Sequence, residues 1–555
     1  MLKLENEKIK SALKFWIIVI GITIFATIPY LSKEDIWADD FTYHLNRILS
    51  IANEFKAGNF PSLIHFTLLD GFGYANPLFY PELFLHIPAV LINAGLDILF
   101  TYKFFIIMIT FFTIIVTYFS AKRIFNNESI SWNVTLLYVL STYRLGDVFV
   151  RAAIGELLSF LFLPLVLLGL YEIIFGENKK WWIICFGIWG VVNSHVLTTV
   201  MTAGIILFMC AINIVRILKD KKRLTNLVIA GVISILLSLS YFLPYIEQNK
   251  NDIFVKDMIR VNGYETVING QFLSDHASSF QDLLKNDLEG FGFEFSKGLL
   301  LILLPVLILR CKNIKYKKDT FLIQCIVMGI ITIIVTSKLF PWKSLEILAI
   351  FQFPYRISIL ATLFLSFVSG FVMYEVFDNK KDMQTIMIFL ILLIVGTQLA
   401  NVDINRRVDV NGVVDERYVN ESPIGNKEYL PMNFKNNISY VYNINDPDIE
   451  IEFTKQNKKV EFYYDYDNDF NINIPFTYYK GYIAYVEDNN GNKTDITVEK
   501  NPNNSNVLIV SEEKVKGDVT VEYKMTVIQI ISYIISYTTL LALLCYIVIN
   551  SRKKK

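Results

Sequence analysis

Cysteine is scarce in this chain, and neither sign of charge is in excess. The 555 residues include 5 cysteines, and 52 basic residues balance 52 acidic ones. The neutral balance gives no electrostatic case for binding nucleic acid. No cysteine lies within residues 402–523, so disulfides are not expected there, and no Cys/His cluster has zinc spacing. A Walker-type phosphate loop is also absent, so a nucleotide is not the expected phosphate substrate.

Apolar residues dominate what is present. The hydrophobic fraction is 53%, the aromatic fraction is 14% and mean hydropathy is +0.42, which excludes an ordinary soluble protein. Apolar runs of about 20 residues, long enough to cross a membrane as helix, recur along the chain. The first run is too long for a signal peptide and lacks a small-residue cleavage site after it, so we expect it to be retained. The sequence predicts a polytopic α-helical membrane protein with about 12 transmembrane helices.

The expected spans are about 13–32, about 101–121, 131–147, 149–175, 181–194, 196–217, 224–246, 297–311, 320–338, 352–376, 384–401 and 525–549. The segment Glu82–Leu96 is short and contains His86 and Pro88, so we interpret it as an interfacial helix.

The basic residues predict how these spans are oriented. Lysines precede the first span, and dense basic clusters recur at Lys122–Arg123, Lys179–Lys180, 216–223 and in the tail 552–555. Because such clusters favour the cytoplasmic side, the number of spans between them places all four on one face. We therefore expect a multi-pass protein of the plasma membrane with both termini in the cytoplasm and residues 402–523 outside.

Composition divides the chain into three parts. Residues 1–401 form the predicted multi-span catalytic domain, with a first outer loop at 33–100. Residues 402–523 are polar and contain alternating runs such as Ile449–Phe453, which favour an antiparallel, β-sandwich-like domain. Its simplest interpretation is a cap or a recognition module. Residues 524–555 supply a final transmembrane helix and a basic tail.

Charged residues stand where the first span should emerge into water. Asp39, Asp40, His44 and Arg47 follow it directly, and charges at that depth usually serve a function. If residues 40–56 are helical, Asp40, His44 and Arg47 form one polar stripe opposite an apolar face, as in an interfacial amphipathic helix. The alternative is a plain interfacial helix with snorkelling charges, but aspartate side chains are too short to snorkel.

Other polar residues fall at the same predicted outer level, contributed by several segments. Paired charges at a helix end can simply neutralise each other, and a lone histidine can be a buried, satisfied one; both alternatives stay open. These candidate substrate-binding residues, with Arg47, are Asp70, Tyr74, Arg144, Asp147, Arg151, Glu156, His195, Gln352 and Arg356.

A membrane-level site of carboxylates and arginines suits a lipid-linked phosphate substrate. A carboxylate can deprotonate an acceptor hydroxyl. Arginines bind phosphate in a bidentate manner and stabilise the charge that develops as a sugar leaves it. Nucleotide sugars are not available outside the cell, so a lipid-phosphate sugar is the donor expected at such a site.

Several stretches resemble a known group of membrane proteins. The acidic pair after the first span, the interfacial loop helix, the many spans and the outer domain resemble the GT-C superfamily of glycosyltransferases, and more narrowly the bacterial YfhO-type proteins. A related set carries the label 6-pyruvoyl-tetrahydropterin synthase related, but nothing in this chain supports pterin chemistry. The stretches are Asp-Asp-Phe-Thr-Tyr-His-Leu-Asn-Arg (39–47), Asp-Gly-Phe-Gly-Tyr-Ala-Asn-Pro-Leu-Phe-Tyr-Pro (70–81), Arg-Ala-Ala-Ile-Gly-Glu (151–156), Asn-Ser-His (193–195), Gln-Phe-Pro-Tyr-Arg (352–356) and Pro-Phe-Thr-Tyr-Tyr-Lys-Gly-Tyr (475–482).

The resemblance implies a polyprenyl-phosphate sugar donor and an acidic residue in the first outer loop. Carried over, that role falls on Asp40 or Asp39, with His44 beside them. YfhO-type proteins are linked with glycosylating envelope polymers such as lipoteichoic acid. The acidic motif here is Asp-Asp rather than Asp-x-Asp, so a divalent-metal cofactor is not favoured.

The predicted function is therefore transfer of a sugar from a polyprenyl-phosphate donor to an envelope glycopolymer, such as a teichoic acid, on the outer face. The expected partners are the lipid bilayer, the donor and the acceptor, with no nucleic acid. Two rivals remain. A transporter or flippase of lipid-linked sugars would show an inverted repeat and mid-span polar residues. A non-catalytic envelope assembly protein would tolerate loss of the acidic pair.

Overall fold

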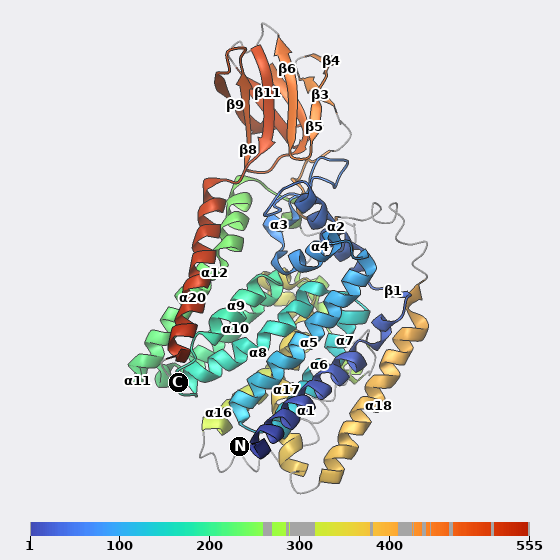
Figure 1. Ribbon diagram of the computed structural model, residues 1–555, viewed down its shortest axis with the longest axis vertical. Coiled ribbons are helices and arrows are strands. Elements are labelled where there is room, and N and C mark those ends of the chain that lie inside the picture. The colour runs from blue at the N-terminus through green and yellow to red at the C-terminus, as the bar shows by residue number, and fades with distance from the viewer. Residues whose placement is uncertain are drawn as a thin grey trace. The chain divides into compact units, whose positions relative to one another are not determined.

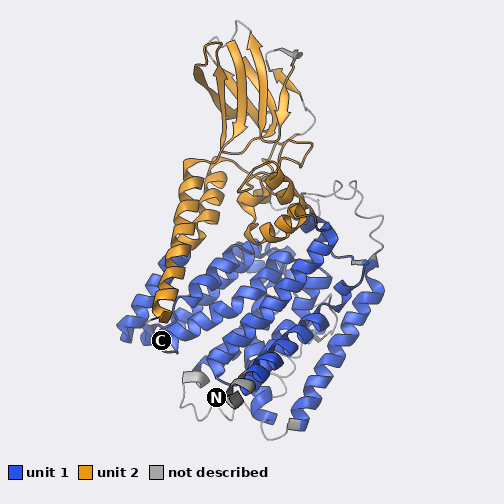
Figure 2. Cartoon of the chain, in the orientation of Figure 1, with its two compact units in different colours: residues 1–45, 96–235, 268–419 blue, residues 46–95, 236–267, 420–555 orange. Residues whose placement is uncertain are grey.

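The computed structural model describes residues 2–258, 269–284, 288, 317–377, 381–408, 424–425, 427–435, 440–444, 446–465, 470–511 and 516–552. The chain divides into two compact units, shown in different colours in Figure 2. Unit 1 comprises residues 1–45, 96–235 and 268–419. Unit 2 comprises residues 46–95, 236–267 and 420–555.

Unit 1 is a helical bundle. Within it, α5 packs against α1, α6 and α8, while α17 packs against α6, α16 and α18, and Figure 1 shows these helices running alongside one another. Its main helices are α1 (Leu2–Ala26), α5 (Ile98–Phe125), α6 (Glu128–Val139), α7 (Thr142–Phe149), α8 (Ile154–Ile174), α9 (Ile183–Val192), α10 (Val196–Ile212), α11 (Ile214–Lys219), α16 (Lys317–Thr336), α17 (Ser358–Phe377) and α18 (Lys381–Asn405).

The polytopic helical class is confirmed. Among the described residues, seven helices are long and apolar enough to cross a membrane; α9, α10 and α16 are shorter apolar helices. The long helix α12 (Lys221–Asn251) begins in unit 1 and ends in unit 2. The predicted span 297–311 lies outside the described residues.

Two predicted spans are interrupted in the structure. The expected span 131–147 is divided into α6 and α7, because α6 ends at Val139 and the Ser141 hydroxyl accepts a hydrogen bond from the backbone N–H of Arg144, capping a new helix. The expected span 196–217 is divided at Asn213, between α10 and α11. Periodicity of apolar residues does not reveal such breaks, since the composition stays apolar across them.

The expected span 352–376 also starts later than predicted. Helix α17 begins at Ser358, and the residues before it form the 3-10 turns η4 (Trp342–Ser344), η5 (Glu346–Phe351) and η6 (Pro354–Ile357). Gln352 has a φ of 62°, which breaks the helical path between η5 and η6. These turns place Tyr355 and Arg356 immediately before the N-terminus of α17.

In unit 1, basic and acidic side chains pair where α5 and α8 end. Lys122 and Arg123 lie in the last turn of α5, and the Arg123 Nε is 2.5 Å from Glu172 Oε1 near the end of α8. Asp39 and Asp40 lie after α1, and Arg151, His195 and Arg356 lie just before α8, α10 and α17.

Unit 2 contains most of the loop 33–100 as well as the strands of the C-terminal β-rich domain. Helix α2 (Phe41–Lys56) confirms the expected helix at 40–56 and enters this unit at Asn46. The predicted helix within Glu82–Leu96 is confirmed as η2 (Leu83–Leu85) and α4 (His86–Asn93), preceded by α3 (Asn76–Phe79). The final helix, α20, spans Val527–Arg552.

The C-terminal β-rich domain is confirmed, and its sheet is continuous rather than split in two as in a sandwich. Its antiparallel strands follow the order β4-β3-β7-β10-β9-β8-β11-β6-β5, with β9 joining the two halves. The strands are β3 (Val441–Asn443), β4 (Asp446–Ile451), β5 (Thr454–Gln456), β6 (Lys459–Asp465), β7 (Phe470–Thr477), β8 (Tyr482–Glu487), β9 (Lys493–Lys500), β10 (Asn506–Ser511) and β11 (Lys516–Tyr523). Alternating residues of both halves enclose one apolar core.

The loop predicted at 69–81 packs against this sheet. Leu69, Asp70, Gly71 and Gly73 all have positive φ, so the loop turns tightly, as its composition predicted. The backbone N–H of Thr477 donates to the Phe72 carbonyl at 2.8 Å. Residues 46–95 therefore fold with the β-domain, whereas the sequence assigned the whole loop 33–100 to the multi-span domain.

Candidate functional site

The acidic pair is held by its backbone in unit 1. The N–H groups of Asp39 and Asp40 donate to the carbonyls of Val150 and Arg151, at 2.9 and 2.8 Å. The Asp39 side chain is exposed and that of Asp40 is half-buried. Burial raises the pKa of the Asp40 carboxyl above its usual range, although Arg151 and Arg356 nearby act to lower it. Two adjacent carboxylates therefore occupy different environments, and the half-buried Asp40 interacts electrostatically with Arg151 and Arg356.

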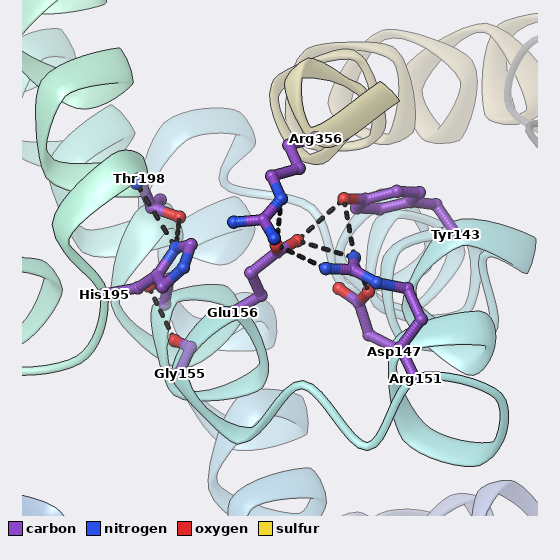
Figure 3. A network of polar contacts seen from close by, with 9 residues as sticks. Tyr143, Asp147, Arg151, Gly155, Glu156, His195, Thr198 and Arg356 are labelled. Atoms are coloured by element: carbon purple, nitrogen blue, oxygen red, sulfur yellow. Dashed lines mark hydrogen bonds and ion pairs between the residues drawn. The ribbon is translucent and has the colours of Figure 1, made fainter. Parts of the chain in front are cut away.

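The centre of that cluster is Arg151, between two carboxylates (Figure 3). Its Nη1 lies 2.6 Å from Asp147 Oδ1, and its Nη2 lies 2.9 Å from Glu156 Oε1. The Tyr143 hydroxyl donates to Glu156 Oε2 at 2.7 Å. Both carboxylates are buried, while Arg151 is 15% exposed. Paired in this way, Arg151 orients Asp147 and Glu156 and has most of its donors occupied.

Arg356 approaches Glu156 from another element, η6 (Figure 3). Its Nε lies 3.8 Å from Glu156 Oε1 and its side chain is 15% exposed. Among the described residues, no hydrogen bond occupies its terminal nitrogens. Arg356 is thus the guanidinium of the cluster with donors left for a ligand.

His195 caps the N-terminus of α10, where its Nδ1 lies 2.8 Å from Thr198 Oγ1. It is buried and near enough to Glu156 to interact electrostatically. The simple interpretation of His195 as a satisfied, buried histidine therefore holds for Nδ1, and the electrostatic interaction links it to the cluster.

Carboxyl groups outnumber guanidinium groups in this cluster. Two guanidinium groups, Arg151 and Arg356, face the carboxyl groups of Asp40, Asp147 and Glu156, with Asp39 close by. Arg144 does not enter the cluster.

Arg144 is fully buried. Its guanidinium donates to Thr110 Oγ1 at 2.9 Å and to the Val139 carbonyl at 3.2 Å. These contacts attach α7 to α5 and to the end of α6, so the expected role of Arg144 as a phosphate ligand is not supported. Gln352 is half-buried, and its φ of 62° marks the break before η6.

The polar stripe predicted along α2 is buried. Within unit 2, the Arg47 Nε lies 2.9 Å from Glu82 Oε1, and His65 Nε2 lies 3.0 Å from Glu82 Oε2. Burial alone would raise the pKa of Glu82, but His65 and Arg47 outweigh it and lower the pKa to about 2. Arg47 therefore anchors the outer loop, and His44 is buried as well. Glu82, from later in the loop, therefore covers Arg47 on this polar stripe.

Two further candidates lie in unit 2. Asp70 is exposed at the tight turn, with a φ of 54°. Tyr74 is buried, and its hydroxyl accepts a hydrogen bond from the backbone N–H of Tyr429 at 3.2 Å. Tyr74 thus supports the loop, whereas Asp70 remains accessible.

The sequence reasoning missed Tyr143, Tyr355, His65 and Glu82. Tyr143 bonds to Glu156, and the Tyr355 ring lies 5.1 Å from the Arg151 guanidinium. Tyr143 and Tyr355 each directly precede an arginine among the candidate site residues. This position in the sequence is the signal that could have identified them. Within the described part of the chain, no group of three or more His, Cys, Asp or Glu residues could hold a metal ion.

The chain is similar in part to known proteins. No protein-family model matches the chain. An uncharacterised protein of Lactococcus lactis subsp. cremoris (strain MG1363) is 24% identical over 358 residues, which cover 61% of this chain and 56% of that protein. The chain thus spans little more than half the length of this relative.

Two solved structures are similar in part. The crystal structure of ArnT from Cupriavidus metallidurans bound to undecaprenyl phosphate has a TM-score of 0.45 and 13% identity, covering 68% of this chain and 64% of that one. Arabinofuranosyltransferase AftD from Mycobacteria has a TM-score of 0.44 and 12% identity, covering 70% of this chain and 27% of that one. Because both TM-scores lie below 0.5, we base no conclusion on these likenesses.

Proposed function

We propose that this protein is a GT-C-type membrane glycosyltransferase. It would move a sugar from a polyprenyl-phosphate donor to a cell-envelope glycopolymer on the outer face of the plasma membrane. The observation that carries the proposal is the half-buried Asp40 carboxylate beside Arg356, a guanidinium with donors left for an anion. One group can remove a proton and the other can bind a phosphate.

Each group of the cluster has a proposed part in the reaction. Asp40 accepts the proton of the acceptor hydroxyl as its oxygen attacks the anomeric carbon, and the bond from that carbon to the phosphate oxygen breaks. Arg356 binds the departing phosphate and stabilises its added negative charge. Arg151 holds Asp147 and Glu156 in place and is a positioning residue. Asp39, being exposed, is the alternative base.

The proposal is tested by complementing a deletion strain with the wild-type gene, Asp40→Asn, Asp39→Asn and Arg356→Gln. Envelope glycopolymer sugar and lipid-linked sugar are measured together. We expect Asp40→Asn to lower transfer by about 10²–10⁴-fold, the usual contribution of a general base, and the lipid-linked donor to accumulate. Asp495→Asn, on an exposed position of β9, is the matched control and should transfer normally.

The outcomes separate the rival functions. Normal glycosylation in both aspartate variants would refute the catalytic assignment and favour an assembly protein. Donor accumulating only on the inner leaflet would indicate a flippase instead. The proposed orientation, with both termini in the cytoplasm and residues 402–523 outside, predicts that a tag at Tyr440 is accessible in intact cells.

A further inference from the structure

The segment that follows α1 is fixed to unit 1 at almost every residue before the acidic pair. Residues 32–40, here called the strap, connect η1 (Ile28–Leu31) to α2. β1 (Asp35–Ile36) pairs antiparallel with β2 (Arg407–Val408), and the Trp37 N–H donates to the Arg406 carbonyl at 2.8 Å. The strap therefore has a defined course before its last two residues bond to Val150 and Arg151.

The start of the strap is held by one side chain, Lys103, in the second turn of α5. Its Nζ donates to the carbonyls of Ser32 at 3.2 Å, Lys33 at 3.2 Å and Glu34 at 2.7 Å. An ammonium group has three N–H donors, so three consecutive carbonyls satisfy all of them. Lys103 is 7% exposed, and burying an ammonium is costly unless its hydrogens are bonded. Such a contact fixes both the direction and the position of the chain that it holds.

The far end of the strap is fixed equally firmly. Ala152 has a φ of 53°, and the N–H groups of Arg151 and Ala153 donate to the carbonyls of Gly146 and Asp147, at 3.0 and 2.9 Å. The turn that receives Asp39 and Asp40 is thus itself tied to α7. Between Lys103 and this turn, the strap has little freedom to move the Asp40 carboxylate.

We infer that Lys103 is a positioning residue, which holds the strap so that Asp40 faces Arg356 and Arg151 in the proposed transferase. The inference rests on the proposed function for its effect on rate, but its effect on the strap does not depend on that function. Preorganisation of this kind matters because a misplacement of about 1 Å in a reacting group can lower a rate about 10²-fold.

The first measurement is hydrogen–deuterium exchange of residues 32–40 in the purified full-length protein. In Lys103→Met we expect the amides of Trp37, Asp39 and Asp40 to exchange at least about tenfold faster than in the wild type, because local opening becomes easier. Lys103→Arg keeps several donors and should restore most of the protection. Lys122→Met, on the same helix but half-exposed and paired with Glu128, is the control and should leave the strap unchanged.

The second measurement is transfer of sugar from an undecaprenyl-phosphate-linked hexose in membranes that contain each variant. Lys103→Met should lower kcat about 10–100-fold with the donor KM within about twofold of wild type, because alignment is lost rather than binding. The acid limb of its pH–rate profile should move to lower pH as Asp40 becomes more solvated. Lys103→Arg should recover most of the rate.

The two measurements distinguish the positioning role of Lys103 from the proposed transferase function. Unchanged exchange of the strap in Lys103→Met would overturn the positioning role, whatever the activity. Faster exchange with full activity would overturn its link to catalysis. Faster exchange in a protein whose wild type transfers no sugar would leave the structural role of Lys103 intact and refute the proposed function.

Discussion

Glu156 offers the sharpest test of the charged cluster. Its carboxylate accepts hydrogen bonds from Arg151 Nη2 at 2.9 Å, Arg151 Nη1 at 3.2 Å and the Tyr143 hydroxyl at 2.7 Å, and it lies 3.8 Å from the Nε of Arg356. Two unit charges about 4 Å apart interact by about 4 kcal/mol at an effective dielectric constant near 20. The substitution Glu156→Gln keeps the shape, removes the charge and turns an amide NH₂ toward guanidinium donors.

We expect Glu156→Gln to lower the free energy of unfolding by about 3–5 kcal/mol, as when one member of a buried ion pair is removed. The matched control is Glu128→Gln. Glu128 lies 3.1 Å from Lys122, but their side chains are 69% and 32% exposed, so the loss should stay below about 1 kcal/mol. Both variants remove one carboxylate from a helix start in unit 1, and they differ chiefly in burial.

The assay is unfolding of the detergent-solubilised protein followed by tryptophan fluorescence. Glu156→Gln should lower the thermal midpoint by roughly 3–4 °C, because unfolding of 555 residues carries an entropy of about 1.2 kcal/mol per K, and Glu128→Gln should hardly change it. In the double variant with Arg356→Gln, part of the loss should return, with a coupling of roughly 1–3 kcal/mol. If Glu156→Gln unfolds at the same temperature as the control Glu128→Gln, the Glu156 carboxylate does not stabilise the cluster.

Three further predictions follow from local geometry. Because burial raises the pKa of Asp40, the transfer rate should rise with pH through a midpoint above the ordinary 3.8, and Asp40→Asn should abolish that acid limb in a pH–rate series. Glu82 has a folded-state pKa of about 2 against an ordinary 4.5, so its stabilising effect is present above pH 4.5 and is lost as pH falls toward 2; acid titration of wild type against Glu82→Gln should show this loss in the wild type alone. Ala152 has a φ of 53°, which strains a residue that carries a Cβ atom. Ala152→Gly should therefore raise the free energy of unfolding by up to about 1 kcal/mol, seen as a slightly higher thermal midpoint. A lowered midpoint would show that the backbone at Ala152 is not strained.

The sequence alone determined the class of protein, a polytopic helical chain with a C-terminal β-rich domain. Long apolar runs predicted the helices, because a membrane-crossing helix has a length that composition reveals. The alternation of apolar and polar residues predicted the C-terminal strands. The prediction that residues 40–56 are helical is confirmed by α2. Asp40, Arg151, Glu156 and Arg356 were all candidates before their contacts were known.

Only the tertiary structure decided which of these charges meet. Arg144 and Arg151 look alike in the sequence, yet one is bonded to Thr110 and the other to Asp147 and Glu156. Helical phase grouped Arg47 with Asp40, but Glu82, from later in the loop, pairs with Arg47. Periodicity reports which face of a helix a residue occupies, whereas partners are set by the packing of segments distant in the chain. The contact between Lys103 and the strap is also set by tertiary packing. No sequence feature near residue 103 indicates that this side chain donates to the carbonyls of residues 32–34.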